Sequence, residues 1–298
     1  MDEDALKIRR EVGKVSYEAL LKARDMIKPG AKLLDVAEKT EAYAKEKGFG
    51  CAFPLNLSVD DEAAHYTPSI GDEKVFGEND IVKVDFGAEK NGLLGDCALT
   101  VDLSGKYTEL VEASRSALDA AIDAIRPGVE FRAVGAEIQK AIEAKGFRPI
   151  LNLGGHGVEE HNLHAGTFIP NYDNGDDTLF EEDMVIAIEP FATNGKKNLI
   201  IESDICDIYS LNGIGSVRSG DARKLLEEIS RKYNSEPFAV RWLAGVLGSK
   251  FATYAAIGEL TRNGILEPHP MLLGTGVITQ AEAEVIVTEG SCEVLTKT

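Results

Sequence analysis

The chain has 298 residues, enough for one large domain or two ordinary ones with a sizeable core. Its net charge of −18 argues against a nucleic-acid or anionic-membrane surface, because both kinds of surface need clustered lysine and arginine. Four scattered cysteines, an N-terminus without an apolar signal region and no apolar run of membrane-spanning length together predict a cytoplasmic protein.

Two helices are predicted at the start of the chain. Residues 4–27 carry apolar side chains at helical spacing and stop at Lys28-Pro29-Gly30. A second helix is expected over residues 31–47, ending at Gly48.

These two helices recur later in the chain. Asp25-x-Ile27-x-Pro29-Gly30 matches Asp123-x-Ile125-x-Pro127-Gly128, and Lys47-Gly48-Phe49 matches Lys145-Gly146-Phe147. Both matches have the same offset of 98 residues. The repeat therefore predicts an internal duplication that builds two related halves.

A short strand over residues 81–84 leads into Asp85. The pair Asn91-Gly92 then predicts a hairpin that returns the chain to Asp96. An antiparallel hairpin can bring these two aspartates close together, and buried carboxylates need a cation or a shifted pKa. Two interpretations stay open for this stretch alone: half of a metal site, or two aspartates in turns.

Each predicted half supplies a histidine and then a strand that ends in an acid. The first half has His65 and Asp85, and the second has His164 and Glu189. Two related halves facing each other would place these four groups around a shared central cleft.

Residues 195–275 break the repeat. Three helices are expected there, over 219–234, 238–247 and 250–262, followed by a short strand. A helix-turn-helix could suggest a DNA-binding unit, but this stretch has no dense basic face. We therefore expect an inserted, winged-helix-like subdomain, after which residues 277–287 return to an alternating, half-buried strand.

Five residues are candidate metal ligands. The set contains four carboxylates and one imidazole, which suits a pair of divalent ions such as Mn, Fe, Co or Zn. Two such ions and one hydroxide would leave the cluster near a net charge of about −1. Singly, each residue also fits a structural place in a turn, a loop or a strand end. The candidates are Asp85, Asp96, His156, Glu189 and Glu282.

At these residues the chain resembles the methionine aminopeptidases. The matching motifs are Lys83-Val84-Asp85-Phe86-Gly87 with Asp96, Gly155-His156-Gly157, His164-Ala165-Gly166, Ile188-Glu189-Pro190 and Gln280-Ala281-Glu282. The inserted helices are similar to those of the type 2 branch in its compact archaeal form. The resemblance implies an α+β pita-bread fold, with residues 1–194 and 276–298 forming the catalytic domain and 195–275 the inserted subdomain.

The resemblance also implies a role for each ligand. Asp85 would chelate one metal ion, while Asp96 and Glu282 would bridge both ions. His156 and Glu189 would hold the other ion, and Glu189 would accept a proton from the attacking water.

Four further residues are implied in substrate binding. His65 and His164 would contact the substrate on the peptide-nitrogen and carbonyl sides of the scissile bond. Phe53 and Leu163 would line the pocket for the methionine side chain. His269 stands where many members of that family carry tyrosine.

The function implied is that of a monomeric metalloaminopeptidase that removes the initiator methionine from nascent polypeptide N-termini with small second residues. Two alternatives stay within the same fold. Prolidases and aminopeptidase P proteins typically carry a separate N-terminal domain, whereas here the duplication begins near the start of the sequence. Non-enzymatic binding proteins of this fold have lost metal ligands and gained basic tails, whereas this acidic chain keeps all five ligands.

Overall fold

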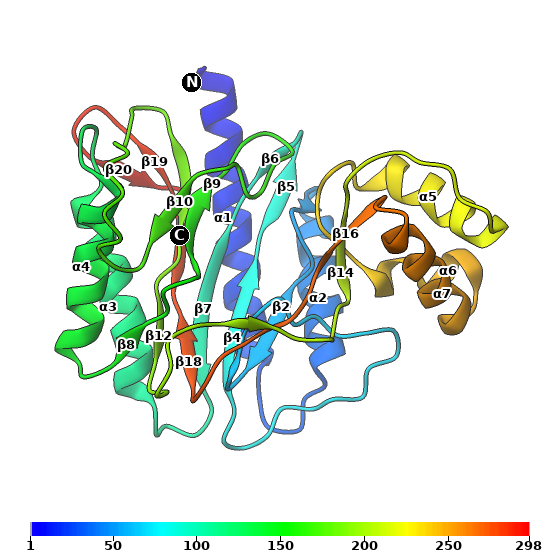
Figure 1. The fold of residues 1–298 in the computed structure, drawn as a ribbon, viewed down its shortest axis with the longest axis horizontal. Helices are drawn as coiled ribbons and strands as arrows, with labels where there is room; N and C mark the ends of the chain where they lie inside the picture. Colours follow the sequence, from blue (N-terminus) through cyan, green and yellow to red (C-terminus); the bar gives the residue numbers. More distant parts are fainter. Residues whose placement is uncertain (1, 298) are drawn as a thin grey trace.

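The computed structural model describes residues 2–297, and its centre is an antiparallel sheet of eight strands (Figure 1). Seven strands lie in the order β10-β9-β11-β19-β7-β4-β2, and β20 pairs with β19. Their bounds are Phe168–Pro170 (β10), Gly154–Gly157 (β9), Val185–Ile188 (β11), Glu282–Val287 (β19), Cys97–Asp102 (β7), Ile81–Phe86 (β4), Asn56–Val59 (β2) and Cys292–Val294 (β20). Strands of the two predicted halves therefore meet on either side of β19.

Each half of the sheet is covered by its own helix pair. Helices α1 (Glu3–Met26) and α2 (Leu33–Glu46) bury their apolar faces against β2, β4 and β7. Helices α3 (Thr108–Ala124) and α4 (Phe131–Ala144) pack in the same way against β11 and β19, at the left of Figure 1. The predicted α+β architecture of two halves is confirmed.

The backbone repeats between the halves in detail. Gly30 and Gly128 follow the first helix of each pair and have φ angles of 81° and 83°. Their N–H groups donate to equivalent carbonyls, those of Phe76 at 2.7 Å and Phe180 at 2.9 Å. In both halves the helix ends at an extended isoleucine, and the proline and left-handed glycine form the turn that follows. Glycine is suited to this turn because it adopts a positive φ angle without a steric cost. The predicted duplication is confirmed.

The hairpin expected after Asp85 is also observed. Strand β4 pairs with β7, placing Phe86 opposite Cys97, and the chain between them forms the smaller hairpin of β5 (Ala88–Lys90) and β6 (Leu93–Leu94). Asn91 and Gly92 turn this hairpin with φ angles of 56° and 80°. Both positive angles are typical of the tight turn that an Asn-Gly pair predicts.

The stretch after the second half has a hydrophobic core of its own, at the right of Figure 1. It contains α5 (Gly220–Lys232), η1 (Val240–Leu243), α6 (Ala244–Leu247) and α7 (Lys250–Arg262). Beside them lies a three-stranded sheet of β15 (Phe238–Ala239), β14 (Ile208–Leu211) and β16 (Leu266–His269). The helix expected over 238–247 is wrong at its start, because Phe238 and Ala239 extend to pair with β14 and only the last four residues are α-helical.

Three other small sheets complete the chain. They are β1-β5-β6, β18-β12-β8 and β13-β17-β3, with β1 at Gly50–Cys51, β18 at Ile278–Gln280, β12 at Phe191–Thr193, β8 at Arg148–Pro149, β13 at Ile201–Glu202, β17 at Leu272–Leu273 and β3 at Glu62–Ala64. The two ends of the 195–275 stretch pair with each other as β13 and β17, and β17 also pairs with β3 of the first half. The domain boundaries at those positions stay a prediction. Among residues 2–297, no helix combines the length and the apolar character needed to cross a membrane.

Candidate active site

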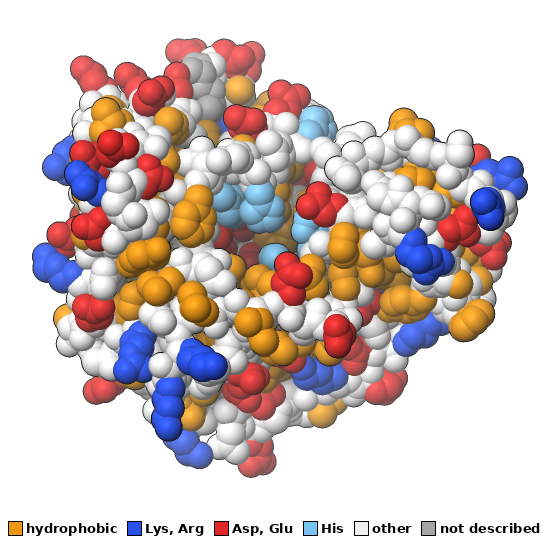
Figure 2. Space-filling model, in the orientation of Figure 1, with side chains coloured by type: hydrophobic (Ala, Val, Ile, Leu, Met, Phe, Trp, Pro, Cys, Tyr) orange, Lys and Arg blue, Asp and Glu red, His pale blue; other side chains and the backbone are white. Residues whose placement is uncertain are grey.

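A cavity of about 380 Å³ opens on the face of the molecule shown in Figure 2, where histidine side chains gather in a hollow. All nine residues that the sequence singled out line this one cavity. They are the ligand candidates Asp85, Asp96, His156, Glu189 and Glu282, the histidines His65 and His164, and the apolar residues Phe53 and Leu163.

Strand register brings the acids together. Asp85 on β4 and Glu282 on β19 both lie opposite Ala98 of the strand between them, so their side chains share one row of the sheet. Asp96 comes directly before β7, and Glu189 directly after β11. Glu282 is 5% exposed rather than half-buried as expected, because β19 is a central strand with neighbours on both sides.

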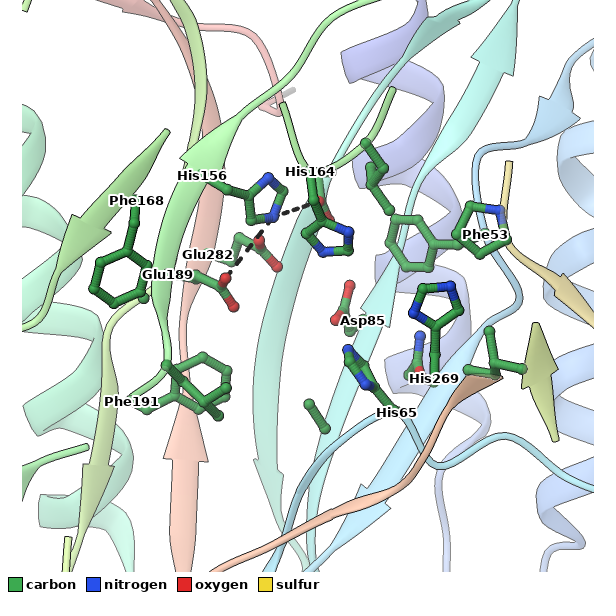
Figure 3. A pocket seen from close by; sticks show the side chains of 18 of the residues that line it. Phe53, His65, Asp85, His156, His164, Phe168, Glu189, Phe191, His269 and Glu282 are labelled. Carbon is green, nitrogen blue, oxygen red and sulfur yellow. Dashed lines mark ion pairs between the residues drawn. The ribbon is translucent and has the colours of Figure 1, made fainter. Parts of the chain in front are cut away.

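The side chains converge around His156 on β9. Its Nε2 atom lies 3.5 Å from Asp96 Oδ2 and 3.8 Å from Glu189 Oε1 (Figure 3). Asp96, His156 and Glu282 each offer a ligand atom, and these three atoms lie within 4.8 Å of one another. Such a spacing is compatible with a shared cation.

Gln280 joins two of the acids and was given no role from the sequence. Its Nε2 atom donates to Glu189 Oε2 and to Glu282 Oε2, at 3.4 Å in each case. The signal that could have revealed it is its position two residues before Glu282, which places both side chains on one face where the strand alternates.

The electrostatics of the cluster fit a cationic occupant. Burial raises the pKa of Asp85 to about 7, and its Oδ1 atom is buried without a hydrogen-bond partner. Burial, and then repulsion by neighbouring carboxylates, raises the pKa of Asp96, Glu189 and Glu282. Four carboxylates and an imidazole form a donor set suited to divalent ions, which would relieve this repulsion.

The histidines around the acids are held neutral by burial. Burial lowers the pKa of His65 to about 4 and also lowers the pKa of His156 and of His164. His65 Nδ1 lies 3.3 Å from the carbonyl oxygen of Pro270, which can only accept. The neutral ring therefore carries its proton on Nδ1 and leaves Nε2 as an acceptor.

The two substrate-binding candidates lie on different sides of Asp85 in Figure 3. The His164 ring packs against the His156 ring with centroids 4.4 Å apart. The His65 ring meets the His269 ring edge-on at 6.2 Å, and His269 Nε2 lies 2.9 Å from Ser210 Oγ. His164 is thus oriented by His156 of the cluster itself, and His65 by neighbours outside it.

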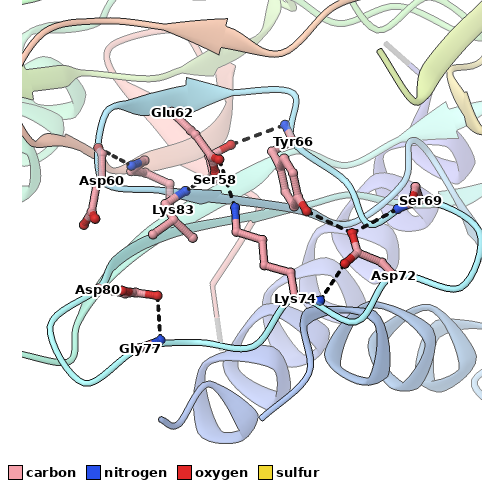
Figure 4. A network of polar contacts seen from close by, with 11 residues as sticks. Ser58, Asp60, Glu62, Tyr66, Ser69, Asp72, Lys74, Gly77, Asp80 and Lys83 are labelled. Atoms are coloured by element: carbon pink, nitrogen blue, oxygen red, sulfur yellow. Dashed lines mark hydrogen bonds and ion pairs between the residues drawn. The ribbon is translucent and has the colours of Figure 1, made fainter. Parts of the chain in front are cut away.

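A polar network surrounds the turn between β2 and β3, the segment that leads to His65 (Figure 4). Lys83, buried on β4, donates from Nζ to the carbonyl of Asp60 at 2.8 Å, and Lys74 Nζ contacts Glu62 Oε1 at 2.9 Å. His65 itself has a φ angle of 63°, unusual for a residue with a side chain. The network holds the strand that places this strained residue.

Apolar side chains form the rest of the cavity wall. Phe53 and Leu163 belong to one hydrophobic cluster, as their shared role predicts. Ile208 and Pro237 also line the cavity, and both come from the stretch after the second half. No sequence signal marks these two, because an isolated apolar residue in a strand or loop does not reveal which cavity it faces.

Comparison with known proteins identifies relatives of this chain. The family model of metallopeptidase family M24 matches residues 7–222. A methionine aminopeptidase of Archaeoglobus fulgidus is 42% identical over 299 residues, covering all of both chains. The crystal structure of a methionine aminopeptidase from Thermotoga maritima is 25% identical, with a TM-score of 0.73 and coverage of 100% of this chain and 98% of that one. A thermophilic Arx1 has a TM-score of 0.85 at 15% identity, covering 99% of this chain and 91% of that one, a likeness of fold alone.

Proposed function

The chain belongs to metallopeptidase family M24, and on that premise we propose how it removes the N-terminal methionine of proteins. The observation that carries the proposal is the buried cluster of four carboxylates and one imidazole beside an apolar cavity. Two divalent ions, of Mn, Fe, Co or Zn, fit this set. Asp85 would hold one ion, Asp96 and Glu282 both, and His156 and Glu189 the other.

When bound, such ions would polarise the scissile carbonyl and lower the pKa of a water between them. Glu189 would take a proton from the attacking water and pass it to the leaving amine. Gln280 holds one oxygen of this carboxylate and thereby orients it.

The two histidines would position the peptide bond. His65 Nε2, left as an acceptor by the contact of Nδ1 with Pro270, can receive the N–H of the scissile amide. His164 is neutral, so an N–H of its ring can donate to the carbonyl oxygen as negative charge develops there.

The apolar wall accounts for the preference for methionine as the residue that is removed. Phe53, Leu163, Ile208 and Pro237 line the same cavity as the acids. An unbranched, polarisable thioether fits such a wall. We propose nascent polypeptide N-termini with small second residues as substrates, and a monomer in the cytoplasm as the working form.

The test is hydrolysis of the tripeptide Met-Ala-Ser by metal-stripped protein, with and without added Mn²⁺ or Co²⁺. We expect release of methionine only with metal, and a loss of about 100-fold or more in kcat for Glu189→Gln. Glu182→Gln, a change at an exposed acid, is the matched control and should leave the rate unchanged. Folded protein without turnover on any divalent ion would overturn the proposal in favour of a binding protein.

A prolidase activity can be distinguished from methionine removal by the substrates that are cleaved. Cleavage of an Xaa-Pro dipeptide faster than Met-Ala-Ser would contradict the assignment of the apolar wall to methionine.

A further inference from the structure

A fifth buried acid lies behind the four of the proposed metal centre. Glu284 follows Glu282 by two residues on β19, so both side chains are on the same face of the strand. It is 1% exposed. Across the sheet it pairs with Ala187, which pairs in turn with His156, so Glu284 and His156 share one row.

Glu284 also contacts a proposed ligand directly. The register of β19 and β7, with Ala283 opposite Cys97, brings Glu284 beside the backbone of Asp96, whose N–H opposes the rise in the pKa of the Glu284 carboxyl group. Because Asp96 precedes β7, this contact supports the backbone from which the Asp96 side chain reaches the centre. The backbone of Glu284 is itself held, since its N–H donates to Thr296 Oγ1 at 2.9 Å.

An arginine from the first helix faces this acid. Arg9 of α1 lies on the buried face of the helix with Val12 and Ser16, and only 5% of the residue is exposed. Its Nη1 atom is 3.6 Å from Glu284 Oε1. Neither Nη1 nor Nε of Arg9 has a hydrogen-bond partner, so the charge of Glu284 is the main compensation for burying this guanidinium.

We propose that Glu284 and Arg9 form a second layer of the metal centre and set its affinity for divalent cations. Glu284 is a positioning residue that acts through Asp96 and adds a negative charge, which Arg9 balances. The inference rests on the proposed function, because it takes Asp96, His156 and Glu282 as ligands.

The sum of the charges in the site predicts how metal affinity changes when Glu284 is substituted. Bound cations favour the ionised form of each acid. With two divalent cations bound, the four ligand carboxylates and Glu284 carry −5, and Arg9 brings the total to −4, which the cations neutralise. Glu284→Gln would leave the protein groups with a total charge of −3 against the +4 of the two cations. It would also leave Arg9 without its partner. An uncompensated charge in a buried site is costly, so this variant should bind metal more weakly. Adding Arg9→Met returns the total to −4.

The test is the Kd for Mn²⁺, measured by titration calorimetry on metal-stripped full-length protein. Glu284→Gln should weaken binding about 10- to 100-fold, the usual effect of changing a residue that orients a ligand. Arg9→Met/Glu284→Gln should return the Kd to within about threefold of the wild type. The control is Glu293→Gln, which removes an acid paired with Arg10 at 2.7 Å between α1 and β20 in an exposed position, and it should leave the Kd unchanged.

An unchanged Kd in Glu284→Gln overturns the inference, and so does a weakened Kd that the second change does not restore. If Glu284→Gln does not fold, Glu284→Asp replaces it, because the shorter side chain keeps the charge but withdraws from the Asp96 amide. A wild-type Kd in that variant would equally overturn the inference. Failure of the wild type to bind Mn²⁺ would contradict the proposed function as well, whereas the other outcomes leave that function intact.

Discussion

The buried ion pair between Glu41 and Arg241 offers a sharp test of how the fold supports the site. Both side chains are 4% exposed, and Arg241 Nη2 donates to Glu41 Oε1 in a short contact. Arg241 Nη1 also donates to Thr67 Oγ1 at 2.6 Å and to the Pro68 carbonyl at 3.2 Å. These two residues follow His65 by two and three positions, so one guanidinium ties α2, η1 and the segment that carries a proposed catalytic histidine.

Arg241→Met would leave the carboxylate of Glu41 buried without its cation. Removing one partner of a buried pair costs about 3–5 kcal/mol in the free energy of unfolding. For a chain somewhat larger than 150–250 residues, about 4 kcal/mol corresponds to a fall in Tm of about 10 °C. The Trp242 indole, 2.8 Å from Glu41 Oε2, would remain and keep the loss near the lower limit.

Thermal denaturation followed by circular dichroism measures this loss. Arg231→Met is the control, because the Arg231 side chain is 67% exposed beside Glu228 and should shift Tm by no more than about 2 °C. At a temperature where both proteins are folded, Arg241→Met should also lower kcat/KM for Met-Ala-Ser by about tenfold through displacement of His65. A Tm within about 2 °C of the wild type would refute the reasoning.

Three further predictions follow from the site and the duplication. Burial raises the pKa of Asp85 to about 7, so in metal-free protein its contribution to stability is complete near pH 4 and is lost as the pH rises through about 7. Because cations bind the ionised form, the rise in Tm on adding Mn²⁺ should grow between about pH 5 and pH 7.5, and an equal rise at both would contradict this. Gly30→Ala and Gly128→Ala should each lower the free energy of unfolding by about 1–2 kcal/mol in urea denaturation, since both φ angles are near +80°; a neutral change at either would count against the shared turn. His65→Ala should lower kcat about 100-fold yet leave the Kd for Mn²⁺ within about twofold, whereas a large change in Kd would make His65 a ligand.

Much of the fold could be predicted because its signals are local. The Pro-Gly turn after the first helix of each half is visible in two adjacent residues. Glycine at a positive φ explains this turn without reference to the rest of the chain. The Asn-Gly turn is equally local. The error at residues 238–247 has the opposite cause: Phe238 and Ala239 become a strand because β14 is available to pair with them, which no short window reveals.

The acids of the site could also be predicted, because each ends or begins a strand in a recurring pattern. Gln280 could have been found from its spacing to Glu282. Arg9 and Glu284 could not, since they are far apart in sequence and meet only when α1 packs on the central sheet. A buried arginine on a helix otherwise looks like an irregularity in an amphipathic pattern.

The position of β19 explains why this site needs the whole fold. Asp85 and Asp96 belong to the first half, His156 and Glu189 to the second, and Glu282 to the strand between them. Neither half alone holds the complete set, so carboxylates that repel one another are brought together only when both halves pair with β19. Metal binding would relieve that repulsion in the folded state alone, and the free energy of binding would therefore add to the stability of the junction between the halves.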